Sequence, residues 1–368
     1  MEHNGRALTT GWPSKVWRSQ TLKSRCAGRM PRLRGLALAA CVAVGALSGI
    51  PDGQAAEHSL RLGHGIAEEH PLGQGAKHFA SLLERKSEGR LKMRVYPATQ
   101  LGSEGQMIAA VRSGVQDVVI TSTAPVATMI NEYLLFDLPF LVKDEKEADA
   151  LLDGPIGERL LSLSEPRQMI GLCYWENGFR QVTNSRREVS SLDGMVGLKI
   201  RTMQNPVYID AFKRLGTNAI PMPFTELYTA MESRAIDAQE NPIAIIHSNN
   251  FHEVQRYVTL TNHAYAPYVV LMSAKRWRSL DAGDQQLLRA GCREARDHQR
   301  QLNRKLTSQL VEDLKREGMT ITSLSDTEVK RFRERLEPVV EQYTQKIGPD
   351  LVREARRQLQ EMRASSRR

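Results

Sequence analysis

The sequence predicts an α/β protein made of two α/β units in one chain, followed by a long helical region. Two patterns carry this prediction: segments with strand-like and helix-like apolar spacing alternate twice along the chain, and helical spacing dominates the last third. A length of 368 residues suits two domains. The composition, 41% apolar and 25% charged, excludes wholesale disorder.

The first unit covers about residues 59–120. Apolar residues alternate or run continuously at three expected strands: 59–63, 91–95 and 118–120. Helical spacing predicts two helices between them: 72–83 and 102–113. The short glycine pairs at 73–75 and 102–105 are expected to lie in loops. This alternation is typical of a parallel sheet covered by helices, and ligands of such folds bind beyond the carboxyl ends of the strands.

The pattern then restarts after residue 168. Strands are expected at 169–174, 198–201 and 235–239. Residues 175–179 are expected to form an aromatic and polar loop. Helices are expected at 205–215 and from about 224 onward, with Thr225 as the N-cap of the second. These elements predict a second α/β unit.

Helices are expected to fill the C-terminal third. Residues 281–317 carry an i, i+4 ladder of leucines: Leu302, Leu306, Leu310 and Leu314. A helix of that length spans roughly 55 Å at 1.5 Å per residue, so we expect it to lie across both units. Ser325 and Glu328 form the pattern of a capping box at the next helix. The last dozen residues are rich in Arg and Gln and are expected to be frayed or solvated.

The basic excess of the chain lies at its two ends. The formal charge is +9, of which residues 1–56 carry +6 and residues 352–368 carry +4, while the body between them carries −1. A nucleic-acid partner is therefore not expected. Residues 30–56 have the order of a secretory signal peptide: a cationic segment, an apolar run of about 15 residues, then small residues.

The signal peptide predicts export to the periplasm and cleavage after Ala55 or Ala56. Residues 1–29 are patternless, so we expect them to be a mis-called extension with Met30 as the true start. The alternatives are an N-terminal anchor helix, for which the apolar run is short, and a lipoprotein modified at Cys41. Cys173 and Cys292 remain in the mature chain, where a disulfide and two separate buried thiols are both possible.

The motifs of common enzyme and metal sites are missing from the sequence. It contains no phosphate-binding loop, no H-E-x-x-H, no G-x-S-x-G and no C-x-x-C. His247 and His252 are five residues apart, which does not suit a shared metal ion. We therefore expect no catalytic residues, no metal and no cofactor.

Polar residues at the ends of predicted strands are the candidates for a binding site. Arg201 and Asn241 each end or follow a strand of the second unit, and Arg180 follows the 175–179 loop. A guanidinium is suited to binding a carboxylate through two hydrogen bonds. The alternative for each of them is an exposed ion pair. Four residues of the first unit are candidates by position alone, with ordinary loop polarity as the alternative: His64, Glu68, Ser122 and Thr123.

Four motifs in the second unit follow one another in a specific order: 177–181 (NGFRQ), 197–201 (GLKIR), 221–228 (PMPFTELY) and 237–242 (DAQENP). In this order and spacing the sequence resembles the DctP family, the extracytoplasmic solute receptors of tripartite ATP-independent periplasmic (TRAP) transporters. Segments 96–102 and 138–140 fit the same family, and the resemblance covers about residues 58–340. Ala238 stands where the family usually has glycine.

The resemblance implies a two-lobed periplasmic-binding-protein fold with a long helix spanning both lobes. It implies lobe I at 57–177 and 267–306, lobe II at 178–266 and 307–348, and a basic tail at 349–368. It also implies that Arg201 clamps a ligand carboxylate, that Asn241 lies beside it, and that Arg180 is a second contact or a hinge residue. Phe224 matches an apolar wall of the pocket. Trp175 and Asn177, which lie in the expected loop before Arg180, are further candidates for ligand binding.

The implied function is capture of an organic acid and its delivery to a TRAP permease by hinge closure. A sugar acid is preferred over a C4-dicarboxylate, because Asn, Trp and Thr outnumber further arginines among the candidates. A monomer is expected. The alternatives are a secreted α/β hydrolase or lyase, and a receptor that serves a sensor kinase.

Overall fold

The structure is a computed structural model and describes residues 58–365. The expected signal peptide at 30–56, its cleavage site and the extension at 1–29 lie outside the described residues. The described residues fall in one compact unit. Among them, no helix is both long enough and apolar enough to span a bilayer.

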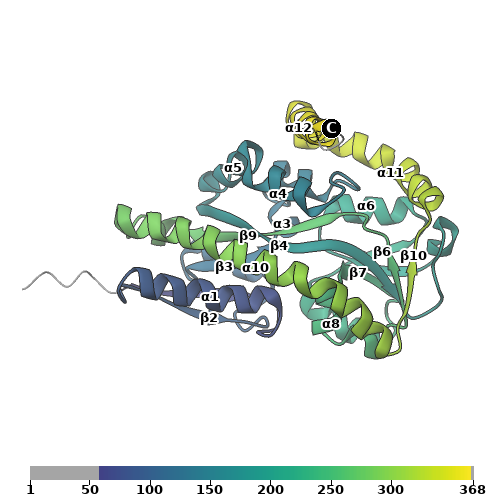
Figure 1. The fold of residues 1–368 in the computed structure, drawn as a ribbon, viewed down its shortest axis with the longest axis horizontal. Helices are drawn as coiled ribbons and strands as arrows, with labels where there is room; N and C mark the ends of the chain where they lie inside the picture. Colours follow the sequence, from purple (N-terminus) through teal and green to yellow (C-terminus); the bar gives the residue numbers. More distant parts are fainter. Residues whose placement is uncertain (1–57, 366–368) are drawn as a thin grey trace, which may run out of the picture. The chain divides into compact units, whose positions relative to one another are not determined.

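A mixed sheet of ten strands forms the centre of this unit (Figure 1). The main path runs β2-β1-β3-β9-β4-β7-β5-β6, while β8 joins β4 and β10 joins β8. The strands are β1 (His58–His64), β2 (Leu91–Tyr96), β3 (Val118–Ser122), β4 (Met169–Asn184), β5 (Lys199–Thr202), β6 (Asn218–Pro221), β7 (Ala238–Pro242), β8 (Tyr257–Leu260), β9 (Tyr265–Ser273) and β10 (Thr320–Ser323). The α/β class is confirmed.

The expected parallel pairing holds within each end of the sheet but not at its centre. β1 is parallel to β2 and β3, and β5 is parallel to β6 and β7. Two strands, β9 and β4, lie between the two groups: β9 is antiparallel to both β3 and β4, and β4 is antiparallel to β7. The sequence analysis did not predict β9, so it missed the element that makes the sheet mixed.

The 16-residue strand β4 joins the two parts of the sheet. It pairs with β9 as far as Phe179 and then with β7 from Arg180 onward. The expectation of a loop at 175–179 is wrong, because these residues continue the strand with their polar groups buried. The change of partner lies within two residues of the implied lobe boundary after residue 177, and the lobe boundaries stay a prediction.

Helices pack on both parts of the sheet (Figure 1). Their bounds are α1 (Pro71–Lys86), α2 (Glu104–Ser113), α3 (Thr123–Val126), α4 (Glu145–Asp153), α5 (Pro155–Ser162), α6 (Pro206–Arg214), α7 (Leu227–Glu232), α8 (Ile243–Ser248), α9 (Ala274–Trp277), α10 (Ala282–Arg316), α11 (Asp326–Ile347) and α12 (Pro349–Ser365). The described residues also form five short 3₁₀ helices: η1 (Asn131–Asp137), η2 (Glu165–Arg167), η3 (Leu192–Met195), η4 (Phe224–Glu226) and η5 (Phe251–Glu253).

Several local expectations are wrong. The glycine pairs at 73–75 and 102–105 are not loops throughout, because Gly73 and Gly75 lie inside α1 and Gly105 lies inside α2. Gly75 allows a close approach: a Cβ there would lie 2.9 Å from both Trp175 and Gln299. Thr225 is not an N-cap, because η4 precedes α7 and no side chain caps that helix.

One predicted strand is displaced along the chain, and one predicted capping box forms only in half. The strand expected at 235–239 begins three residues later as β7, after a turn in which Arg234 has a positive φ of 58°. Ser325 caps α11 by accepting a bond from the Glu328 amide. The Glu328 carboxylate accepts a bond from the Leu192 amide instead of returning to Ser325, so only half of the capping box forms.

The predicted long helix is confirmed as α10, which begins after the N-cap Asp281 and has 35 residues. It packs against α1 and β4 at one end and against α8 and β10 at the other, and so contacts both parts of the sheet (Figure 1). A disulfide joins Cys173 on β4 to Cys292 on α10, which settles the choice that the sequence left open. The bond fixes the first half of α10 to β4.

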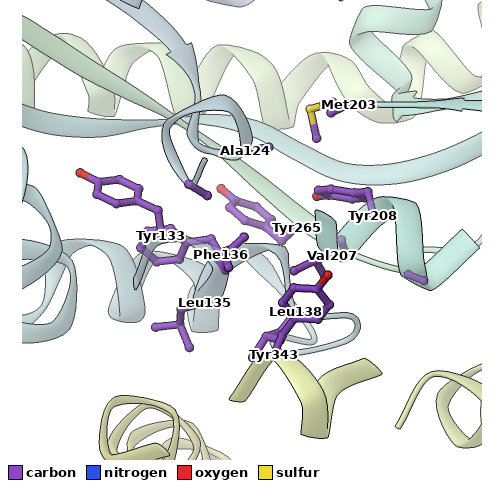
Figure 2. Packing of buried hydrophobic residues seen from close by; sticks show 14 of the residues in the cluster. Ala124, Tyr133, Leu135, Phe136, Leu138, Met203, Val207, Tyr208, Tyr265 and Tyr343 are labelled. Carbon is purple, nitrogen blue, oxygen red and sulfur yellow. The ribbon is translucent and has the colours of Figure 1, made fainter. Parts of the chain in front are cut away.

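The C-terminal helix α12 is not frayed. Four of its side chains are buried: Leu351, Val352, Ala355 and Leu359. With α11 they join a core cluster that includes Tyr133, Phe136, Tyr208 and Tyr265, shown in part in Figure 2. Tyr133 and Phe136 pack edge to face, with ring centroids 6.1 Å apart. Arg353, Arg356 and Arg357 therefore lie on the outer face of a packed helix, whereas Arg363 binds the buried Glu147 carboxylate.

Candidate ligand-binding site

The candidate site is a cavity at the carboxyl ends of strands from both parts of the sheet. β3 contributes Ser122, β5 contributes Arg201, and β7 contributes Asn241. Because these strands end at the same place, their last side chains meet there. The full lining is Gly65, Ile66, Leu72, Thr99, Glu104, Ile120, Ser122, Asn177, Arg201, Met203, Phe224, Thr225, Asn241, Ile245 and Tyr268.

An outer chamber of about 190 Å³ adjoins this cavity. The two share Glu104, Arg201, Met203 and Phe224. The inner cavity has a volume of only about 30 Å³, which is room for little more than a water molecule. A larger solute therefore fits the inner cavity only if its walls separate, whereas Arg201 also lines the larger outer chamber.

Arg201 is a buried cation to which the described part of the chain offers no carboxylate partner. Its side chain is 2% exposed, and its Nε and Nη2 donate to the Met222 carbonyl oxygen at 3.0 and 2.8 Å. Its Nη1 has no hydrogen-bond partner. Burial lowers the pKa of Arg201 to about 10 from 12.5, and the charges of Glu240 and Glu104 only partly oppose this effect. Arg201 thus presents a positive charge that no ion pair among the described residues neutralises.

Arg180 differs from Arg201 because its charge is compensated. It is fully buried, and its guanidinium forms an ion pair with Glu240, with Nη2 2.9 Å from Oε1. His263 lies 3.2 Å from the same carboxylate. Burial would raise the pKa of Glu240, but Arg180 and His263 hold it below its ordinary value. Arg180 does not line the cavity; it lies beside it and donates to Asn241 Oδ1 at 3.2 Å.

Two asparagines line the cavity and differ in their hydrogen bonds. The side chain of Asn241 is fixed, since its Oδ1 accepts from Arg180 and its Nδ2 donates to Gln239 at 2.6 Å. Asn177, on β4, is 2% exposed and its Oδ1 has no partner. A buried amide oxygen without a donor is costly, so Asn177 is available to accept a hydrogen bond from a solute.

Glu104 adds a carboxylate to the lining. Its Oε1 accepts bonds from the Thr121 hydroxyl at 2.9 Å and from the Ser122 amide at 2.8 Å. It lies in the first turn of α2, next to the N-cap Ser103. The sequence analysis missed Glu104, Thr99 and Tyr268. Ser103, a typical N-cap residue, could have indicated that Glu104 begins a helix close to a strand end. The assignment of the glycine pair at 102–105 to a loop hid this indication.

The structure brings together five of the ten residues expected from the sequence: Arg201, Asn241, Phe224, Asn177 and Ser122. Phe224 lies on η4 and lines both the inner cavity and the outer chamber, as expected for an apolar wall. Arg201, Asn241 and Arg180 are all buried, so the alternative of exposed ion pairs is wrong for these three.

Arg180 and four further expected residues lie outside the lining. Trp175 is fully buried and its Nε1 donates to the Cys292 carbonyl oxygen at 3.2 Å. Thr123 is buried in α3, and Glu68 forms an exposed ion pair with Lys77. His64 is buried, its Nδ1 faces the Ile66 amide, and burial lowers its pKa to about 4.

The described residues contain no group of three or more His, Cys, Asp or Glu side chains arranged to hold a metal ion. His247 and His252 both lie near Glu317 instead, at 3.7 and 3.1 Å. The site is thus a charged and amide-lined cavity suited to binding a solute.

The family model described as "bacterial extracellular solute-binding protein, family 7" (DctP) matches residues 62–346. This chain belongs to the DctP family. The resemblance in the four motifs is thereby confirmed, and so is the expectation that the protein is not an enzyme, because the family consists of solute-binding proteins.

Individual relatives agree with this assignment. The chain is 38% identical over 281 residues to the 2,3-diketo-L-gulonate-binding periplasmic protein YiaO of Escherichia coli, covering 76% of this chain and 85% of that protein. It is 40% identical to the sugar acid binding protein DctPAm of Advenella mimigardefordensis in complex with galactonate, with a TM-score of 0.82 over 83% of this chain and 99% of that one. A TRAP periplasmic solute binding protein of Polaromonas bound to D-erythronate shares 34% identity, with a TM-score of 0.79 over 82% of this chain and 98% of that one.

Proposed function

We propose that this DctP-family protein captures a sugar acid in the periplasm and delivers it to a TRAP permease. The observation that carries the proposal is the uncompensated guanidinium of Arg201 in the cavity. A buried charge without a partner is unfavourable, and an incoming carboxylate supplies that partner together with hydrogen bonds.

Closure of the two parts around the solute strengthens this interaction. Residues of the first part, such as Glu104 and Ser122, and residues of the second, such as Arg201 and Asn241, line the same cavity. When they approach one another they exclude water, and the attraction between guanidinium and carboxylate grows as the local dielectric falls. The solute thus stabilises the closed form by its higher affinity for it.

The remaining polar groups favour a hydroxylated monocarboxylate over a dicarboxylate. Asn177 Oδ1 and the Glu104 carboxylate are acceptors, and hydroxyl groups can donate to both. A second carboxylate next to Glu104 would meet a like charge. The diketogulonate-, galactonate- and erythronate-binding relatives support the same choice. A C4-dicarboxylate is the second candidate.

The wider setting is part of the same proposal. Export with cleavage after Ala55 or Ala56 agrees with the extracellular family, and the nearly neutral body of the chain agrees with the lack of a nucleic-acid partner. A monomer is part of the same proposal. The alternative is that the loaded protein is recognised by a membrane sensor kinase instead of the permease. It would use the same ligand and the same closure.

Thermal denaturation of the purified protein against a panel of acids tests the proposal. Galactonate, galacturonate, erythronate and 2,3-diketogulonate are expected to raise the melting temperature more than succinate does. At a concentration of 1,000 times Kd a ligand stabilises the protein by about 4 kcal/mol. Arg201→Gln should remove the response to every acid. The proposal is wrong if no carboxylate raises the melting temperature, or if Arg201→Gln responds like the wild type.

A further inference from the structure

A second cavity, of about 480 Å³, shares only Asn177 with the ligand-binding site. It lies where β4 changes partners, between the start of α8, the loop before α4, and α10. We call it the β4–α10 cavity, and the residues of its lining used below are Glu145, Asn177, Phe179, Asn303, Arg304 and Ser308. Its volume falls within the usual range for small-molecule sites, about 300–1,000 Å³.

Two buried acceptors in its lining have no donor. Asn303 is 3% exposed, and its Nδ2 donates to Glu176 Oε1 at 2.9 Å, which fixes the orientation of the amide. The Oδ1 of Asn303 is left without a partner, as is the Oδ1 of Asn177. Each unpaired buried acceptor costs about 1–3 kcal/mol, so a solute that donates hydrogen bonds here is stabilised.

The cations of this cavity are already paired, in contrast to Arg201. Arg304 binds Asp149 through Nη1 and Nη2 at 2.9 and 2.7 Å, and its Nε donates to Glu176 at 2.8 Å. Lys143 lies 3.4 Å from Glu147. No uncompensated positive charge in this lining is therefore available for an anion, so the cavity does not suit an organic acid.

The rest of the lining suits an uncharged solute with many hydroxyl groups. Glu145 adds a further acceptor. Phe179 adds an aromatic face, held edge to face against Tyr265 at a centroid distance of 5.2 Å. A polyol or neutral sugar can donate hydroxyl groups to the amide and carboxylate oxygens while its carbon-bound hydrogens contact the ring.

We propose that the β4–α10 cavity is a second solute site, which binds a neutral polyol or sugar. It differs from the proposed sugar-acid site in position, in charge and in the class of ligand. The two cavities share Asn177, but Asn303, Glu145 and the paired cations belong to the β4–α10 cavity alone, and Arg201 does not line it, so the inference does not depend on the proposed function.

Galactitol and galactose are the probes, and saturation-transfer NMR with isothermal titration calorimetry is the measurement. We expect both compounds to bind the wild-type protein with a millimolar Kd, and to bind Arg201→Gln equally well. Asn303→Leu should weaken binding at least about tenfold, which corresponds to 1.4 kcal/mol. Ser308→Trp should also block binding, because it fills the rim of the cavity from an exposed position and leaves the Glu176 network intact.

Ser162→Trp is the matched control, since it places the same side chain at an exposed position on α5. It should bind both probes like the wild type. The inference is wrong if neither probe binds at about 50 mM, a concentration that saturates a millimolar site. It is also wrong if Ser308→Trp and Asn303→Leu leave binding unchanged, or if Arg201→Gln abolishes it. Thermal denaturation with the panel of acids tests the sugar-acid site independently, so each proposal can fail without the other.

Discussion

The two buried arginines should respond in opposite ways to the same substitution. Methionine is close to arginine in length but carries no charge, so Arg201→Met and Arg180→Met each remove a guanidinium with little change in volume. Arg201 lacks a carboxylate partner, whereas Arg180 is paired with Glu240. The comparison therefore tests whether the charge of Arg201 is held in reserve for a ligand.

The magnitudes follow from the contacts. The pKa of Arg201 is lowered from 12.5 to about 10, so below pH 10 burial of its charge destabilises the ligand-free fold by about 3 kcal/mol. Arg201→Met relieves this cost but loses two bonds to Met222, worth about 1.5–3 kcal/mol each. We expect its free energy of unfolding to fall by about 0–3 kcal/mol relative to the wild type. Arg180→Met leaves the Glu240 carboxylate buried and unpaired, which should cost about 3–5 kcal/mol.

Urea titration followed by circular dichroism at neutral pH, without ligand, measures both values. A binding acid should then raise the melting temperature of the wild type but not that of Arg201→Met. If Arg201→Met loses as much stability as Arg180→Met, the charge of Arg201 is already satisfied within the protein. The argument that it awaits a carboxylate would then fail.

Further predictions use the same assays. Replacing Cys173 and Cys292 by serine removes a cross-link across 119 residues, and should lower the free energy of unfolding by up to about 5 kcal/mol; an unchanged value would contradict a stabilising disulfide. Glu104→Gln should weaken binding of hydroxy acids relative to succinate in the thermal panel, and an unaltered ranking would exclude Glu104 as a determinant of specificity. Burial lowers the pKa of His70 from 6.5 to about 3, so the unfolded state binds the proton more tightly and stability falls as the pH drops from 6.5 to 4. His70→Asn keeps the N-cap acceptor and should remove about 3 kcal/mol of that loss, measured by urea titration at both pH values; an equal loss in the variant would contradict the assignment. Leu359→Ala should cost about 2–4 kcal/mol, whereas a frayed α12 would make the change neutral.

Elements with one apolar face were predictable from the sequence. The strands β1 and β2, the helix α1 and the long helix α10 all show regular apolar spacing, and each lies within a few residues of its expected bounds. β4 was predicted only as far as Tyr174, because Glu176, Asn177 and Arg180 interrupt its apolar pattern. Their polar groups are buried by contacts with α10, β7 and β9, and such distant partners leave no local signal.

In the binding site, too, residues with a local sequence signal were predictable and residues defined by distant contacts were not. Arg201 and Asn241 were predictable because strand ends and family motifs coincide at these positions. The partner of Arg180 was not, since Glu240 lies 60 residues further along the chain and no spacing rule connects them. Glu104 and Tyr268 come from α2 and β9, and only the folded sheet places them beside Arg201.

The pairing of β9 also sets the order in which the protein can fold. β9 lies between β3 and β4, and Ser122 is paired with Tyr268 and Met169 with Ser273. A nascent chain that ends before residue 273 therefore lacks the strand at the middle of its sheet, and Cys292 is not yet present to cross-link β4. Contacts so distant in sequence form slowly. The sheet can therefore be completed only when most of the chain has been made, and the cross-link between β4 and α10 can form only later still.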